Sequence, residues 1–171
     1  LTGGGGADRL TGGAGSDTAD YAASGAGVTV LLGGTGSGGD AEGDVLAGIE
    51  NLVGSGFGDV LVGDGAANAL SGGAGDDRLV GKGGADRLDG GAGTDAADFS
   101  GSTGAVTADL AAGTASDGAS LVAIEDLIGS AFDDALNGDG GDNRLAGGAG
   151  ADLLDGRDGF DTADYSGSAA A

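Results

Sequence analysis

Residues 54–98 read, in steps of nine, GSGFGDVLV, GDGAANALS, GGAGDDRLV, GKGGADRLD and GGAGTDAAD. In every step the first residue is Gly, the sixth is Asp or Asn, and the eighth is Leu or Ala, while the fourth is usually Gly. The last three residues of a step suit a short strand, in which the eighth side chain points inward and its two neighbours point outward. A fixed period of this kind indicates a repeat architecture in which each unit packs on the next.

The same period continues on both sides of this stretch. With two nonapeptides in 3–20 and four in 129–164, the chain holds eleven of them, or 99 of its 171 residues. Two segments between them break the period, and β-branched or apolar runs predict strands there, at Val28–Leu32, Ile49–Val53, Val106–Leu110 and Ile124–Ile128. We therefore divide the chain into repeat blocks at 1–20, 54–98 and 129–164, interruptions at 21–53 and 99–128, and a last segment, 165–171, that opens a further interruption or a tail.

A longer repeat lies above the nonapeptide. Residues 1–21 match 79–99 at an offset of 78, and residues 49–64 match 124–139 at an offset of 75. Each block ends with Ala at the eighth position followed by an aromatic residue, which either covers the end of a thin core or simply opens the next loop; these residues are Tyr21, Phe99 and Tyr165. Residues 39–47, GDAEGDVLA, are either ordinary interruption or a degenerate nonapeptide with Asp44 in the sixth position.

Composition excludes several classes of function. The formal net charge of −22 argues against binding to nucleic acid or to anionic membranes, because both would repel the chain. Cys and His are both absent, which removes disulfides, thiolate metal sites and most zinc sites and nucleophilic triads. No apolar run is long enough to span a bilayer, so membrane insertion is not expected. Such a charge with few bulky residues is typical of disorder, so something must neutralise the chain before it compacts.

The nonapeptides quoted above resemble those of the RTX (hemolysin-type calcium-binding) family, whose pattern is G-G-x-G-x-D-x-U-x. The resemblance implies an all-β, right-handed parallel β-roll, which is a β-helix solenoid with two nonapeptides in each turn, here broken by irregular interruptions that contain strands. Residues two nonapeptides apart would then stack, with Leu61 on Leu79, Leu70 on Leu88 and Leu136 on Leu154.

The same stacking would pair the sixth-position residues, as Asp59–Asp77, Asp77–Asp95, Asn68–Asp86, Asp134–Asp152 and Asn143–Asp161. Strands about 4.8 Å apart would hold these carboxylates close enough to repel unless a cation lies between them. Carboxylate and carbonyl oxygens are hard ligands that suit Ca²⁺. The resemblance implies about five or more Ca²⁺ ions, bound by the side chains of Asp8, Asp17, Asp59, Asn68, Asp77, Asp86, Asp95, Asp134, Asn143, Asp152 and Asp161 and, as further candidates, by the main-chain carbonyls of Gly72, Gly81, Gly90, Gly147 and Gly156.

Three features depart from the family pattern. The first repeats of the second and third blocks carry Phe57 and Phe132 in place of the fourth Gly, and the second repeats carry Asn in place of Asp. Asp8 and Asp17 have no nonapeptide partner one full turn later, so their partners lie either upstream or in the interruption.

The resemblance implies a calcium-binding, non-catalytic module of a secreted or cell-surface bacterial protein. Such modules stay unfolded at low calcium, leave the cell through type I secretion machinery and fold outside. Adjacent acids such as Asp76 and Asp77 could suggest a glycosidase pair, but Trp is absent and Tyr and Phe total six, which leaves no aromatic-lined cleft. Two alternatives remain: a repeat unit of an extracellular adhesin, surface layer or filament, where self-association or neighbouring repeats supply partners, and an accessory module of a secreted protease, lipase or alginate epimerase.

Overall fold

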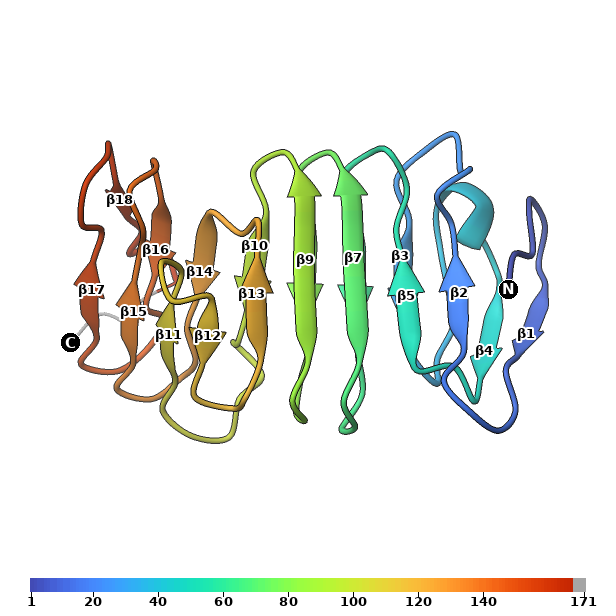
Figure 1. The fold of residues 1–171 in the computed structure, drawn as a ribbon, viewed down its shortest axis with the longest axis horizontal. Helices are drawn as coiled ribbons and strands as arrows, with labels where there is room; N and C mark the ends of the chain where they lie inside the picture. Colours follow the sequence, from blue (N-terminus) through green and yellow to red (C-terminus); the bar gives the residue numbers. More distant parts are fainter. Residues whose placement is uncertain (168–171) are drawn as a thin grey trace.

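Strands form where Leu or Ala stands between two outward-facing residues, and the chain turns after each one. The structure, a computed structural model, describes residues 1–167, so only the first part of the expected segment 165–171 is described. Figure 1 shows the strands side by side from one end of a long, flattened roll to the other. A 3₁₀ turn, η1 (Gly39–Ala41), is the only helical element of the described residues. No helix within them is long and apolar enough to cross a membrane.

The strands form two main sheets and one separate pair. Sheet I has nine strands, in the order β17 (Leu153–Asp155), β15 (Ala135–Asn137), β11 (Thr107–Asp109), β12 (Thr114–Ala115), β13 (Ser120–Val122), β9 (Arg87–Ala92), β7 (Ala69–Ala74), β5 (Asn51–Val53) and β2 (Thr18–Asp20). Sheet II has seven, in the order β18 (Thr162–Ala163), β16 (Arg144–Ala146), β14 (Asp126–Ile128), β10 (Ala96–Asp98), β8 (Arg78–Val80), β6 (Val60–Val62) and β3 (Thr29–Leu31). The pair joins β1 (Arg9–Thr11) to β4 (Val45–Ala47).

Successive nonapeptides alternate between the two sheets, so strands two nonapeptides apart are parallel neighbours. Leu61 pairs with Leu79, Leu70 with Leu88 and Leu136 with Leu154, as the resemblance implied. The leucines of the second block are at most 1% exposed, which makes them the centre of a thin core. The parallel β-roll expected from the sequence is therefore confirmed.

Each interruption inserts three extended segments into one side of the roll. In residues 99–128, β11 lies beside β15, β12 runs antiparallel to it, and β13 returns beside β9. In residues 21–53, β3 lies beside β6, two antiparallel bridges through Ser37 and Thr35 take the place of β12, and β4 lies beside β1. The first insertion extends the side of sheet II, whereas the second widens sheet I.

The four strands predicted in the interruptions are present, each shortened at one or both ends, as β3, β5, β11 and β14. Sequence analysis did not predict the strands that fill the second insertion, β12 and β13. Tyr21 and Phe99 are 2% and 5% exposed, so these two aromatic residues are part of the core, whereas Tyr165 is 69% exposed. Asp44 precedes β4 and is completely buried, which fits the degenerate nonapeptide of residues 39–47.

Candidate metal centre

The sixth residue of each nonapeptide lies just before a strand, so stacked turns place these side chains in rows along the edges of the roll. In five of them the side chain reaches back to the preceding turn, where its Oδ1 accepts the main-chain N–H of the residue two nonapeptides earlier. These contacts are Asp59 N–Asp77 Oδ1 and Asp77 N–Asp95 Oδ1 at 2.8 Å, Asn68 N–Asp86 Oδ1 at 2.9 Å, and Asp134 N–Asp152 Oδ1 and Asn143 N–Asp161 Oδ1 at 3.0 Å. The five pairs expected from the repeat spacing are therefore neighbours in the structure.

The second carboxylate oxygen has no protein partner in many of these residues. Within residues 1–167, Oδ2 is buried and accepts no hydrogen bond in Asp8, Asp17, Asp77, Asp86 and Asp95. Ionised carboxylates are rarely buried unless they are paired or coordinate a metal, because desolvation of the charge is costly. The row of unpartnered oxygens therefore fits a set of cations held along the edge of the roll.

The first glycine of a turn makes room for this oxygen. A Cβ built on Gly72 would lie 2.1 Å from Asp77 Oδ2 and 2.7 Å from the carbonyl oxygen of Gly90, which belongs to the next turn. Carbon atoms normally keep about 3.5–4.0 Å from their neighbours, so no side chain fits here. A carboxylate oxygen and a main-chain carbonyl thus converge on one small space, which is the donor set expected for a hard cation.

The other glycines of a turn serve a different purpose. Gly73 and Gly75, at the second and fourth positions, have φ values of 113° and 108°, whereas Gly72 has no positive φ. Positive φ is easily adopted only by glycine, so these two residues let the chain turn sharply. The sharp turn of this glycine-rich run therefore depends on its second and fourth positions.

In Asp77, Asp86 and Asp95 burial is the largest cause of a raised carboxyl pKa. It raises the pKa of Asp77 to about 7 and that of Asp86 to about 6, and it also raises the pKa of Asp95. The charges of Asp59 and Asp95 raise the pKa of Asp77 further. The ionised form is thus disfavoured in the folded chain alone, and an adjacent divalent cation would reverse that preference.

The sequence pattern of the RTX calcium-binding nonapeptide repeat matches the chain four times, over residues 1–22, 44–79, 71–101 and 128–163, which together make up more than half of it. The chain belongs to the RTX calcium-binding nonapeptide-repeat family. No curated protein matches the chain. The RTX repeats of this family bind Ca²⁺, and carboxylate and carbonyl oxygens are ligands that suit this ion.

In the first RTX repeat after each interruption, both carboxylate oxygens of the sixth residue accept hydrogen bonds from protein groups. Asp59 accepts hydrogen bonds from the main-chain N–H of Ser55 at 2.5 Å, from the Ser55 hydroxyl at 2.8 Å and from the N–H of Val28 at 2.7 Å. Asp134 receives the same two bonds from Ser130. Serine stands at the second position of both repeats, where five of the eleven nonapeptides carry glycine, and its N–H and hydroxyl both bind the aspartate.

Asparagine changes the second RTX repeat of the second and third blocks in a similar way. The Asn68 carbonyl accepts the N–H of Asp64 at 2.9 Å, and its NH₂ group donates to the carbonyl of Glu50 at 3.0 Å. Asn143 donates in the same manner to the carbonyl of Glu125 at 2.9 Å. In these two repeats a neutral NH₂ group that donates to a main-chain carbonyl therefore replaces the second carboxylate oxygen.

Three acids of the interruptions join the rows although they lie outside the eleven nonapeptides. Their side chains accept main-chain N–H groups in the contacts Asp8 N–Asp44 Oδ1 at 2.7 Å, Asp17 N–Glu50 Oε2 at 2.9 Å and Asp95 N–Glu125 Oε2 at 2.8 Å. The partners of Asp8 and Asp17 thus lie in the interruption, which is one of the two places that the sequence allowed. Sequence analysis missed both glutamates, and the only signal was an acid at the second position of a predicted strand.

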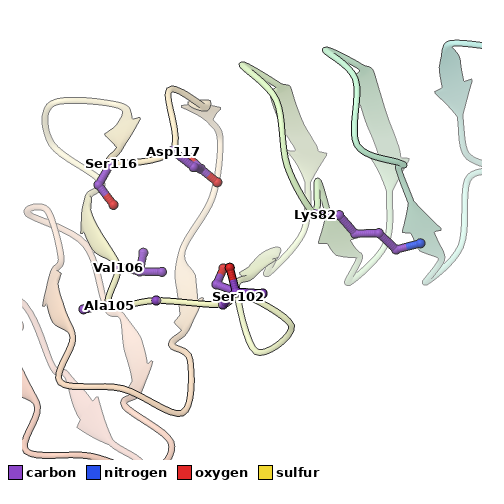
Figure 2. Close-up of a pocket in the computed structure, with 8 residues that line it drawn as sticks. Lys82, Ser102, Ala105, Val106, Ser116 and Asp117 are labelled. Carbon is purple, nitrogen blue, oxygen red and sulfur yellow. The ribbon is translucent and has the colours of Figure 1, made fainter.

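Two further features of the described residues bear on where a ligand could bind. The described part of the chain contains no group of three or more acidic side chains that are placed to hold a metal ion between them. A shallow hollow is lined by Lys82, Ser102, Val106, Ser116 and Asp117, among others (Figure 2). The Lys82 side chain extends away from Ser102 and Asp117, so the hollow does not bring a charged pair together.

Proposed function

We propose that this chain is a non-catalytic RTX module whose folding depends on Ca²⁺. The observation that supports the proposal is the set of five buried aspartate oxygens that accept no hydrogen bond within the described residues. An unpartnered buried charge costs several kcal/mol, which is a large share of the roughly 5–15 kcal/mol that stabilises a typical domain. Ligand present at about 100 times its dissociation constant contributes about 2.7 kcal/mol per site, so several Ca²⁺ ions would decide whether the roll forms.

The proposed Ca²⁺ ligands differ in whether a side-chain oxygen is free of protein hydrogen bonds. Asp8, Asp17, Asp77, Asp86 and Asp95 are the strongest side-chain ligands in this proposal, because each keeps an oxygen free. In the third block Gly147 and Gly156 likewise leave room for the Oδ2 atoms of Asp152 and Asp161, although Asp152 is only half-buried and Asp161 is exposed. In Asp59, Asn68, Asp134 and Asn143 every side-chain oxygen already accepts a protein hydrogen bond, so these residues are weaker ligands that hold the turns together.

A calcium titration tests the folding proposal. The purified chain in chelator is expected to give the circular dichroism of a disordered polypeptide and to gain strand signal as Ca²⁺ rises to the millimolar range typical of extracellular sites. Mg²⁺ at equal concentration is the matched control, because it demands octahedral geometry and dehydrates reluctantly. A chain that is fully folded in chelator, or that responds equally to Mg²⁺, would refute the proposal.

The same calcium dependence is consistent with export before folding. A net charge of −22 keeps the chain extended through self-repulsion when Ca²⁺ is scarce, and extracellular Ca²⁺ would then trigger folding. We infer that the parent protein leaves a bacterial cell through type I secretion machinery and acts outside the cell or on its surface. Export of a reporter fusion that requires the secretion apparatus, followed by folding only in calcium-containing medium, is the expected result.

One observation favours a second role as a unit of an extended extracellular adhesin, surface layer or filament. Both interruptions place their strands in the same order around the roll, in keeping with the longer repeat seen in the sequence. The blocks and interruptions thus form a larger unit that could be repeated along a fibre, each unit packing only on its neighbours. Electron microscopy of the parent protein tests this role, and a compact particle would exclude it in favour of a module attached to a secreted enzyme.

A further inference from the structure

We propose that Glu50 and Glu125 complete two further Ca²⁺ sites, together with Asp17 and Asp95, where a repeat block ends and its interruption begins. The proposal rests on the calcium-binding function above and adds ligands that lie outside the nonapeptides. The sixth-position aspartate of the last nonapeptide in each of these blocks, Asp17 or Asp95, has no following nonapeptide to supply the second half of a site. In the structure a short turn of the interruption takes that place.

The free oxygen of Asp95 faces this turn. Asp95 is completely buried, its Oδ1 accepts the N–H of Asp77 at 2.8 Å, and its Oδ2 has no hydrogen-bond partner in residues 1–167. A Cβ built on Gly90 would lie 2.5 Å from that Oδ2 and 2.2 Å from the carbonyl oxygen of Ala123. Ala123 therefore supplies the carbonyl that a following nonapeptide supplies to Asp77.

Glu125 supplies the matching carboxylate. Its Oε2 accepts the N–H of Asp95 at 2.8 Å, which is the contact that Asp95 Oδ1 makes with the N–H of Asp77. Its Oε1 has no hydrogen bond within the described residues and remains available as a ligand. The pair Asp95 and Glu125 thus reproduces the pair Asp77 and Asp95, with one carboxylate from each of two stacked turns and a carbonyl from the later one.

The length of the turn explains why the acid is glutamate. Three residues, 123–125, separate β13 from β14, whereas six residues, 81–86, separate β8 from β9. Ala123 adopts a φ of 47°, and Ile124 is 5% exposed, so the short turn bends sharply and is anchored in the core. The extra methylene of glutamate lets a carboxylate on this shorter turn reach the N–H of Asp95.

The first interruption shows the same arrangement independently. Gly48 has a φ of 59°, Ile49 is 4% exposed, and Glu50 accepts the N–H of Asp17 at 2.9 Å. A Cβ built on Gly12 would lie 2.0 Å from the carbonyl oxygen of Gly48, and Asp17 Oδ2 is buried without a partner among the described residues. Two turns of different sequence, GIE and AIE, thus bring the same oxygens together.

Native mass spectrometry of the whole chain in Ca²⁺ counts the ions bound and tests the proposal. The double variant Glu50→Gln, Glu125→Gln keeps an oxygen that accepts the main-chain N–H but removes the charge, so it is expected to bind two ions fewer than the wild type at equal Ca²⁺. Glu42→Gln is the matched control, since Glu42 is exposed and accepts only the N–H of Gly38, and it should bind the wild-type number.

An unchanged ion count and unchanged titration midpoint in the double variant would overturn the proposal while leaving the RTX function intact. A wild-type chain that binds no Ca²⁺ would instead overturn the function itself. If the double variant loses its fold, anomalous diffraction from wild-type crystals grown in Ca²⁺ decides. A peak between Asp95 and Glu125 supports the two sites, whereas peaks confined to turns with two aspartates exclude them.

Discussion

Replacement of Gly72 by alanine should block one calcium site without altering any ligand. Gly72 has no positive φ, so its backbone tolerates alanine, but the new Cβ would lie 2.1 Å from Asp77 Oδ2 and 2.7 Å from the Gly90 carbonyl. The shifts that make room for an added methyl group in such a crowded place typically cost about 1–3 kcal/mol. Loss of one ion at about 100 times its dissociation constant removes about 2.7 kcal/mol more. The expected loss in the free energy of unfolding is therefore about 4–6 kcal/mol.

Gly65→Ala is the matched control in the neighbouring turn. A Cβ there meets no atom within 4 Å and φ is not positive, so the variant should be as stable as the wild type or more stable by about 0.4–1 kcal/mol. Urea denaturation in millimolar Ca²⁺, followed by circular dichroism, measures the free energy of unfolding, and ion counting measures the lost site. Equal stability and equal ion counts in the two variants would refute the view that the first glycine clears space for a ligand.

The core, the turns and the acids each carry one more prediction. Leu79→Ala should lower the free energy of unfolding in saturating Ca²⁺ by about 2–5 kcal/mol, because Leu79 is completely buried, and unchanged urea denaturation would contradict this. Lys82→Gly should raise the free energy of unfolding by up to about 1 kcal/mol, and with it the thermal midpoint. The reason is that Lys82 adopts a φ of 73°, which only glycine tolerates easily. A midpoint that stays the same or falls would count against strain at this position. In chelator the folded form should gain stability as pH falls from about 7 towards 4. Burial raises the carboxyl pKa of Asp77 to about 7 and of Asp86 to about 6, so the folded chain binds protons that the unfolded chain does not, and that stability is lost as pH rises through these values. Circular dichroism in chelator measures the strand content, and a strand content at pH 5 that is no higher than at pH 7 would contradict this prediction.

The parts of the fold that repeat locally could be predicted from the sequence. The register of Leu61 on Leu79 follows from a period of nine, because every turn has the same length and each strand presents one apolar residue inward. The adjacency of Asp77 and Asp95 follows from the same period. Nothing beyond the spacing of two residue types was needed for these contacts, since neighbouring turns are related by simple stacking.

The interruptions could not be predicted to the same depth because their contacts join distant residues. Asp17 meets Glu50 across 33 positions and Asp95 meets Glu125 across 30, and no fixed spacing relates these pairs. The antiparallel strand β12 (Thr114–Ala115) is only two residues long, too short to show an alternating pattern. The free Oδ2 atoms were also beyond sequence analysis, since they depend on which protein donors reach each carboxylate.

The number of nonapeptides in the middle block has a consequence for the outer surface of the roll. Each nonapeptide is half a turn, so the five repeats of residues 54–98 carry the chain through an odd number of half-turns. This odd count is why one interruption widens the side of sheet II and the next widens sheet I. Removal or duplication of a single nonapeptide would place both interruptions on the same sheet. Gain or loss of one repeat would therefore decide whether the inserted strands lie on both sides of the roll or on one side only.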